Sequence, residues 1–193
     1  MSIDRARAAK AVEELLTSLG RPPSSDPELA KTGQLVADAW SSELLAGYAM
    51  DASEILGEAL PTSSSEVVAL RNVQTCVMCP HHLLPAPGVV HLAYAPGAKI
   101  VGLGALSRLV QCFARRLTLQ ETLVQNVADA LVQHLGAKGA ACVADLRPTC
   151  LTVRGEHEAS ANVVTIGTAG NMRAGEPLHA TVVELLKARQ PSR

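Results

Sequence analysis

EVVALRNVQTCVMCPHHLLPAPGVVHLAYA, residues 66–95, is the stretch that decides the fold. Residues 66–75 predict a β-strand, and the apolar run Val89–Ala95 predicts a second strand that ends at the turn signal Pro96-Gly97. The loop between the two strands carries Cys79 and His82, flanked by prolines. A thiol and an imidazole at this spacing can point at one Zn²⁺ from a tight turn. The stretch therefore predicts two strands joined by a metal-binding loop.

A catalytic zinc site usually has three protein ligands and keeps one position open for water. Cys79 and His82 supply two, and the best third candidate is Cys150, at the start of an apolar run, 150–154, that is predicted to be a strand. Zinc in such a site makes bound water a nucleophile near neutral pH. His81 lies beside the ligands, and a histidine there is suited to move protons.

Other interpretations of these residues remain open. Cys76 and Cys79 form a C-x-x-C pair, which also occurs in structural zinc sites and in redox proteins. His81 can also serve simply as a hydrogen-bond partner of a backbone carbonyl. Cys112 and Cys142 are predicted to be buried apolar fillers of a helix and a strand.

Composition limits the classes of function. The 193 residues are 48% hydrophobic, 18% charged and 2% aromatic, which predicts a globular core of Val, Leu, Ile and Ala. A net charge of −1 and the lack of a basic block argue against nucleic acid as a partner. No apolar run approaches the ~20 residues of a membrane span. Five cysteines and a charged N-terminus without an apolar signal core predict reduced thiols and a cytoplasmic location.

The periodicity of apolar residues predicts an α+β arrangement, an antiparallel sheet covered on one side by helices. A helical arm is expected over residues 1–60 and a catalytic domain over 61–193. The predicted helices are 4–18, 26–46 (capped by Asp26), 104–116, 119–135 and 178–189, and the predicted strands are 66–75, 89–95, 139–145, 150–154 and 162–168.

These residues resemble the GTP cyclohydrolase I family. Cys79-Pro-His-His-Leu-Leu-Pro85 is similar to the family's C-E-H-H-L-L-P motif, and further matches follow at Val101-Gly-Leu103, Arg108, Gln120-Glu121 and Cys150-Leu-Thr-Val-Arg-Gly155. The resemblance implies the tunnelling fold, a ββααββ unit with N-terminal helices attached. It also implies a homo-oligomer, commonly a toroidal decamer, with active sites at subunit interfaces.

The resemblance also implies an activity, that of a zinc-dependent cyclic amidine hydrolase. In the family, Zn²⁺ on two cysteines and one histidine, matching Cys79, His82 and Cys150, activates water. The water attacks C8 of the guanine ring of GTP, formate leaves, and dihydroneopterin triphosphate forms. His81 matches the histidine thought to protonate the purine. The implied substrate-binding residues are Gln120, Glu121, Val101, Leu103, Arg108 and Arg154.

The chain departs from the family's pattern at several positions. Pro80 stands in place of Glu, Pro148 in place of a second catalytic histidine, Gly104 and Ala105 in place of a Ser-Lys pair, and Leu35 and Asp38 in place of two cations. Each lost charge-assisted contact to a triphosphate costs about 1.5–3 kcal/mol. We therefore expect a zinc hydrolase that acts on a small purine-like or pterin-like N-heterocycle without a triphosphate. The alternatives are an authentic GTP cyclohydrolase I and an inactive ligand-binding paralogue.

Overall fold

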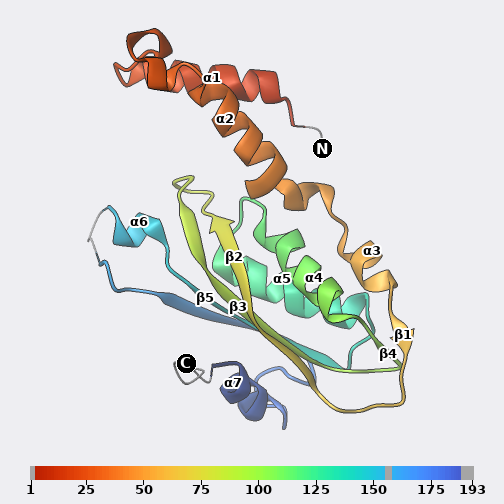
Figure 1. Cartoon of the computed structure of the whole chain (residues 1–193). Helices are drawn as coiled ribbons and strands as arrows, with labels where there is room; N and C mark the ends of the chain where they lie inside the picture. Colours follow the sequence, from red (N-terminus) through yellow and green to blue (C-terminus); the bar gives the residue numbers. More distant parts are fainter. Residues whose placement is uncertain (1–2, 155–157, 188–193) are drawn as a thin grey trace.

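The computed structural model describes residues 3–154 and 158–187 (Figure 1). Its helices are α1 (Arg5–Ser18), α2 (Thr32–Ala39), α3 (Ala52–Gly57), α4 (Leu103–Ala114), α5 (Gln120–Gln133), α6 (Thr149–Thr152) and α7 (His179–Lys187). Its strands are β1 (Leu60–Pro61), β2 (Val68–Met78), β3 (Pro85–Ala95), β4 (Lys99–Ile100), β5 (Gly139–Leu146) and β6 (Val163–Gly170). Gly155 and the last two residues of the helix predicted over 178–189 lie outside the described residues.

Four strands form the main sheet, in the order β2-β3-β5-β6, with every neighbouring pair antiparallel. With α4 and α5 between β3 and β5, the chain order is the ββααββ unit of the expected tunnelling fold. The α+β arrangement with an antiparallel sheet is therefore confirmed. The short strands β1 and β4, which the sequence did not predict, pair with each other beside this sheet.

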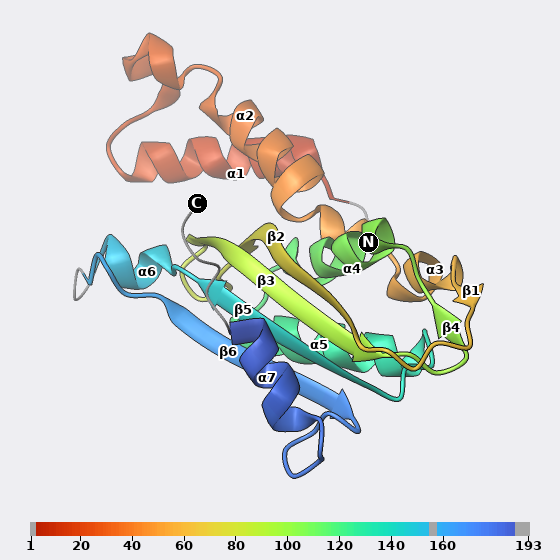
Figure 2. The ribbon, with the colours of Figure 1, turned by 60° about the horizontal axis from the view of Figure 1, so that its bottom comes forward.

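Alternation along the strands divides the apolar side chains between the two faces of the sheet. Val90, Leu92 and Tyr94 of β3 join the large core under α4 and α5. Ala93 and Ala95, one residue out of step, face the opposite side, where α7 packs on them through Val182 and Leu186 (Figure 2). Helices α4 and α5 thus cover one face of the sheet, as expected, and α7 covers part of the opposite face.

The N-terminal helices project from this body as a hairpin of α1 and α2 (Figure 1). The hairpin is tight, because a Cβ added at Gly33 would lie 2.8 Å from the carbonyl oxygen of Ala9. The single helix predicted over 26–46 is wrong. Asp26 caps a short 3₁₀ turn (Pro27–Leu29), α2 then begins at Thr32, and a π-helical turn follows at Trp40–Leu44. A 3₁₀ turn at Ala46–Ala49 connects this region onward to α3.

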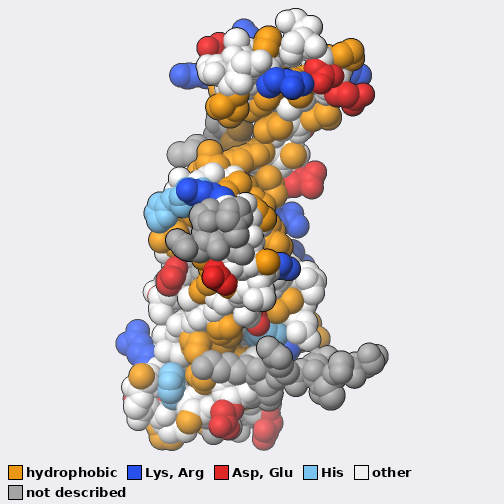
Figure 3. Space-filling view, turned by 90° about the vertical axis from the view of Figure 1, so that its left-hand side faces the viewer, with side chains coloured by type: hydrophobic (Ala, Val, Ile, Leu, Met, Phe, Trp, Pro, Cys, Tyr) orange, Lys and Arg blue, Asp and Glu red, His pale blue; other side chains and the backbone are white. Residues whose placement is uncertain are grey.

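An apolar cavity of about 680 Å³ lies between this hairpin and the loop that follows β2. Val12 and Leu16 of α1, Val36 of α2 and the loop residues His82 and Leu83 are among its lining residues. Figure 3 shows hydrophobic side chains gathered in this narrow junction, with exposed histidine side chains at its edge. The hairpin thus meets the body next to the predicted metal loop.

Candidate metal and substrate site

The loop that joins β2 to β3 carries two of the predicted metal ligands. Met78 pairs with Pro85 at the base of the loop. The amide of Cys79 donates to the carbonyl oxygen of Leu84 at 3.0 Å, and the amide of Leu83 donates to that of Cys79 at 2.9 Å. Leu83 adopts a left-handed φ of 53°, which a non-glycine residue rarely does without cost. This closed turn fixes the positions from which Cys79 and His82 project.

Cys150 reaches the same place from the segment that follows β5, which ends at the same edge of the sheet as β2. The strand predicted over 150–154 is wrong: Cys150 lies in the single helical turn α6. Pro148 starts this turn, since its carbonyl oxygen accepts from the amides of Leu151 and Thr152, and its fixed φ suits a first turn. Cys150 therefore stays a predicted ligand, carried by a helical turn and not by a strand.

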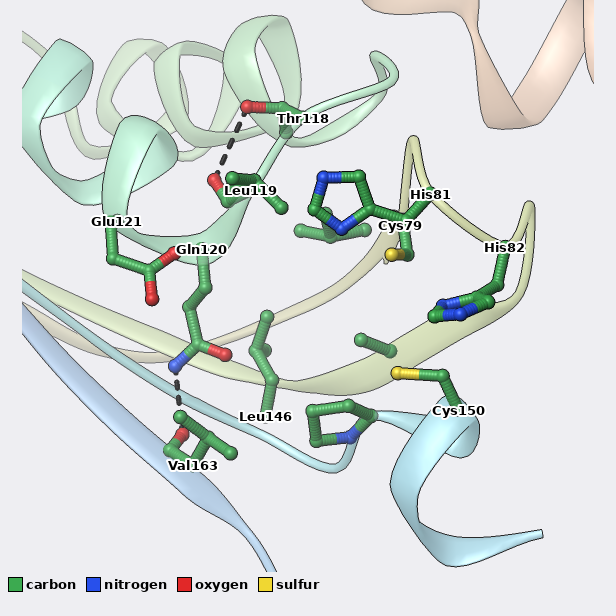
Figure 4. Close-up of a pocket in the computed structure, with 13 residues that line it drawn as sticks. Cys79, His81, His82, Thr118, Leu119, Gln120, Glu121, Leu146, Cys150 and Val163 are labelled. Atoms are coloured by element: carbon green, nitrogen blue, oxygen red, sulfur yellow. Dashed lines mark hydrogen bonds between the residues drawn. The ribbon is translucent and has the colours of Figure 1, made fainter. Parts of the chain in front are cut away.

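The three predicted ligands converge. One donor atom from each of Cys79, His82 and Cys150 lies within 4.8 Å of the other two. Two sulfurs and one ring nitrogen form a donor set that suits Zn²⁺, and three protein ligands leave a coordination position open. The residues present therefore fit the metal that the sequence predicts. Figure 4 shows the two sulfur atoms and the His82 ring around a common space.

The connection between α4 and α5 brings two further predicted residues to this space. The amide of Thr118 donates to the carbonyl oxygen of Met78 at 3.2 Å, which ties the start of α5 to the end of β2. Gln120 and Glu121 are the first two residues of α5. Glu121 is exposed, whereas Gln120 is buried and its Nε2 donates to the carbonyl oxygens of Ala144 and Val163.

A cavity of about 250 Å³ lies in front of these residues. Its lining comprises Val77, Cys79, His81, His82, Ala86, Thr118, Leu119, Gln120, Glu121, Leu146, Pro148, Cys150 and Val163. His81 is exposed, and its ring turns into the cavity between Cys79 and Leu119 (Figure 4). None of these lining residues is a lysine or an arginine. The volume lies below the ~300–1,000 Å³ of typical ligand pockets, so this part of one chain has room for a ring rather than for a whole nucleotide.

Four predicted substrate residues do not line this cavity. Val101 is buried and Leu103 is exposed, and both lie at the N-terminal end of α4, whereas the cavity adjoins the residues after its C-terminal end. A helix of this length spans about 18 Å. Arg108 is exposed and its Nη2 contacts Glu58 Oε2 at 2.8 Å. Arg154 is exposed beyond α6.

The departures from the family's pattern also have places in the structure. Pro148 forms part of the cavity wall where the resemblance implies an imidazole. Ala105 is buried, and Gly104 is exposed beside Arg108. Leu35 is 63% exposed on α2, where Asp38 accepts a hydrogen bond from Gln34 and lies 3.9 Å from Arg5. The cations implied at positions 35, 38 and 105 thus have no substitute among the residues of the cavity.

The other cysteines are buried or half-buried. Cys142 is buried in β5, as expected of an apolar filler. Cys112 is buried in α4, but its Sγ accepts from Arg116 Nη2 at 3.2 Å and lies 3.6 Å from the carbonyl oxygen of Met50, so it is not a purely apolar filler. Burial raises the pKa of both thiols. Cys76 is half-buried on β2, and burial likewise raises its pKa. It does not line the cavity that holds Cys79. The C-x-x-C pair is therefore not the unit that forms the candidate site.

Sequence reasoning missed the apolar wall of the cavity, formed by Leu119, Leu146 and Val163. It also missed Thr149, whose hydroxyl donates to the carbonyl oxygen of Pro85 at 2.6 Å. The pairing of β5 with β6 brings Leu146 and Val163 together, whereas Leu119 comes from the segment before α5 and Thr149 from the turn α6. Their positions next to predicted site residues are the only local signal that points to them.

Comparison with known proteins points to one family. The family described as GTP cyclohydrolase I matches residues 8–187. A GTP cyclohydrolase 1 of Leifsonia xyli subsp. xyli is 40% identical over 169 residues, covering 86% of this chain and 87% of the relative. A GTP cyclohydrolase 1 of Campylobacter lari is 36% identical over 185 residues, covering 95% and 96%.

Among solved structures, the archaeosine synthase QueF-Like in the apo form has a TM-score of 0.46 at 15% identity, covering 56% of this chain and 97% of that chain. In the described part of the chain, none of the helices combines the length and the hydropathy that a membrane span requires. The family match spans nearly the whole chain, and the two relatives align over most of their own length. The chain therefore belongs to the GTP cyclohydrolase I family.

Proposed function

We propose that this chain is a zinc-dependent cyclohydrolase that opens the imidazole ring of a purine nucleotide, with GTP as the substrate that the relatives' names favour. Its family is one of ring-opening hydrolases that act on a small heterocycle and typically form oligomers. The observation that carries the proposal is the convergence of Cys79, His82 and Cys150 within 4.8 Å, in one cavity with His81 and Glu121.

The residues of the cavity have separate roles in the proposed reaction. A zinc ion held by Cys79, His82 and Cys150 supplies a Lewis acid and a nucleophilic water near neutral pH. His81, whose ring turns into the cavity, donates a proton to the ring nitrogen that leaves as the imidazole opens. Glu121 accepts hydrogen bonds from the N–H groups of the guanine, which suits a carboxylate facing parallel donors.

Gln120 contributes through its oxygen. Both N–H groups of its amide donate to backbone carbonyls, so Oε1 is the atom left to accept a hydrogen bond from the ring. The apolar wall of Leu119, Leu146 and Val163 covers the flat faces of the ring and keeps water away from it.

A second candidate substrate is a purine-like or pterin-like ring without a triphosphate. The observation that favours it is the charge of the site, because no described residue that lines the cavity is a lysine or an arginine. Arg108 is already paired with Glu58, and the positions of three implied cations hold Leu35, Asp38 and Ala105. A triphosphate in this position would need cations from outside the described lining, such as those of another subunit.

We further propose that a second copy of the chain completes the site within a homo-oligomer, a toroidal decamer. Support comes from the distance between the cavity and the end of α4 that carries Val101 and Leu103. In a ring of subunits, that end of one chain faces the cavity of the next and brings Val101, Leu103 and Arg108 near the substrate. Arg154, which follows the turn α6 that carries Cys150, contributes from the chain that holds the candidate ligands. A helical arm over residues 1–60, a catalytic domain over 61–193 and a cytoplasmic location complete the proposal.

The test compares substrates. The zinc-loaded protein is mixed with GTP, guanosine and guanine, and loss of purine absorbance reports ring opening. Fluorescence of the oxidised product reports pterin formation from GTP. Turnover of GTP alone supports the first candidate, and preference for guanosine or guanine supports the second. If neither the wild type nor a His81→Ala control changes any of them while the wild type still binds them, the chain is an inactive ligand-binding paralogue and the proposal fails.

A further inference from the structure

The segment that carries Cys150 is a long loop with a narrow base. It leaves the sheet at Leu146, the last residue of β5, and returns at Val163, the first residue of β6. These two residues are direct partners in the sheet. The position of Cys150 relative to Cys79 and His82 therefore depends on what fastens this base and what fastens the helical turn α6.

Gln120 fastens the base. Its side chain is 9% exposed, and its Nε2 donates to the carbonyl oxygen of Ala144 on β5 at 3.0 Å and to that of Val163 on β6 at 2.7 Å. Figure 4 shows the bond to Val163. Carbonyl oxygens only accept, so the partners determine which end of the amide faces the strands. One side-chain amide thus links β5, the strand before the loop, to β6, the strand after it.

Thr149 fastens the helical turn. Its Oγ1 donates to the carbonyl oxygen of Pro85 at 2.6 Å. Pro85 directly follows the loop that carries Cys79 and His82, and Thr149 directly precedes Cys150. The backbone amide of Arg147 adds a bond of 2.8 Å to the carbonyl oxygen of Pro87. The hydroxyl of Thr149 therefore links the two segments that supply the candidate ligands.

We propose that Gln120 and Thr149 are positioning residues of the metal centre, which hold Cys150 within reach of Cys79 and His82. The proposal rests on the metal site of the proposed function and deepens it. Neither side chain ligates the ion. Both reduce the ordering that the Cys150 segment must undergo when the ion binds. Loss of a side chain that hydrogen-bonds a ligand directly lowers metal affinity by about 10–100-fold, and for these two residues, which act through the backbone, we expect the lower end of that range.

The variants are chosen to keep size and shape. Gln120→Met and Thr149→Val remove the donors with little change in volume. The matched control is Gln125→Met, because Gln125 lies on the same helix and its Nε2 donates to the carbonyl oxygen of Thr168 on β6, at 3.2 Å, away from the Cys150 loop. Competition with a chromophoric chelator measures the Zn²⁺ dissociation constant of each full-length protein. Absorption of the Co²⁺ form reports how many thiolates bind.

We expect Gln120→Met and Thr149→Val each to weaken Zn²⁺ binding by about 10-fold or more, and Gln125→Met to change it less than about twofold. The Co²⁺–thiolate absorption of the first two variants should move toward that of Cys150→Ser, because Cys150 is the ligand they release. A structural role alone would lower the melting temperature of the metal-free protein without changing this spectrum.

The proposal is overturned if both variants bind Zn²⁺ as tightly as the wild type, or lose no more affinity than Gln125→Met. If Gln120→Met does not fold, as judged by circular dichroism, Thr149→Val decides alone. A wild type that binds no Zn²⁺ overturns this proposal and the proposed function together. A wild type that binds Zn²⁺ but opens no ring overturns only the function.

Discussion

Replacing His91 with Asn should remove a pH-dependent part of the stability of this fold. His91 is 7% exposed on β3, and its Nδ1 accepts the backbone N–H of Asn72 at 3.1 Å. Asn72 has a φ of 59° and lies where β2 shifts register between Leu70 and Val73. The bond therefore holds an irregular point of an edge strand, and it requires an unprotonated Nδ1.

Burial lowers the pKa of His91, the nearby charge of Arg71 lowers it further, and Asp145 acts in the opposite direction. The folded pKa thus lies below the value of about 6.5 that the unfolded chain shows. Between the two values the unfolded chain binds more protons, so this contribution is complete above about pH 6.5 and is lost as the pH falls toward the folded pKa. The free energy of unfolding can change by up to about 1.4 kcal/mol per pH unit when one group titrates in this way.

Urea denaturation of the wild type and of His91→Asn at about pH 7.5 and pH 5.5 measures the effect. Asn offers Oδ1 as an acceptor for the Asn72 amide but does not titrate. Over the pH unit below 6.5, the wild type should lose up to about 1.4 kcal/mol of unfolding free energy that the variant keeps. His134→Asn, at an exposed histidine after α5, is the control and should follow the wild type. Equal losses in His91→Asn and the wild type would refute the reasoning.

Three further changes test the site and the packing. His81→Ala should keep Zn²⁺ affinity and lower kcat by about 10²–10⁴-fold, and unchanged turnover would remove His81 from the proton transfer. Glu58→Gln releases Arg108 from an exposed ion pair worth about 0.2–1 kcal/mol. The KM for GTP should therefore fall by about 1.5–5-fold, while the KM for guanosine stays constant. An equal fall of both KM values would show that Arg108 does not face the triphosphate. Gly47→Ala would place its Cβ 2.5 Å from the carbonyl oxygen of Cys112 and should lower the free energy of unfolding, measured in urea, by about 1–3 kcal/mol. The control is Gly57→Ala, whose Cβ meets nothing within 4 Å. Similar denaturation midpoints for the two variants would contradict the close approach.

The sheet could be predicted because alternation along a strand is a local property. The predicted strands 66–75, 89–95, 139–145 and 162–168 correspond to β2, β3, β5 and β6. The run Cys150-Leu-Thr-Val153 is short and partly β-branched, which favours a strand by local pattern alone. Pro148 and the bond from Thr149 to Pro85 favour a helical turn instead. The long-range contact decides that segment, and no local pattern encodes it.

The candidate site was predictable to the extent that it depends on ligand chemistry. The spacing of Cys79 and His82 predicts a metal, and Cys150 is predicted as the third ligand from its place at the start of an apolar run and from the resemblance to the family. The burial of Gln120 and its two carbonyl partners had no such signal, because they arise from the packing of α5 on the ends of β5 and β6. Val101 and Leu103 could not be related to the cavity by local sequence, since the ends of α4 lie far apart within one chain.

The three converging ligands also have a consequence for the chain as a polymer. Cys79 precedes β3 and Cys150 follows β5, so an ion bound to both would close a loop of roughly 70 residues that contains β3, α4, α5 and β5. By the entropy model used for disulfides, closing a loop of this length lowers the conformational entropy of the unfolded chain, which stabilises the folded state by on the order of 4 kcal/mol. The ion would then act as a cross-link around most of the large core as well as a catalyst. A variant that loses a ligand should consequently unfold more easily even where no packing contact has changed.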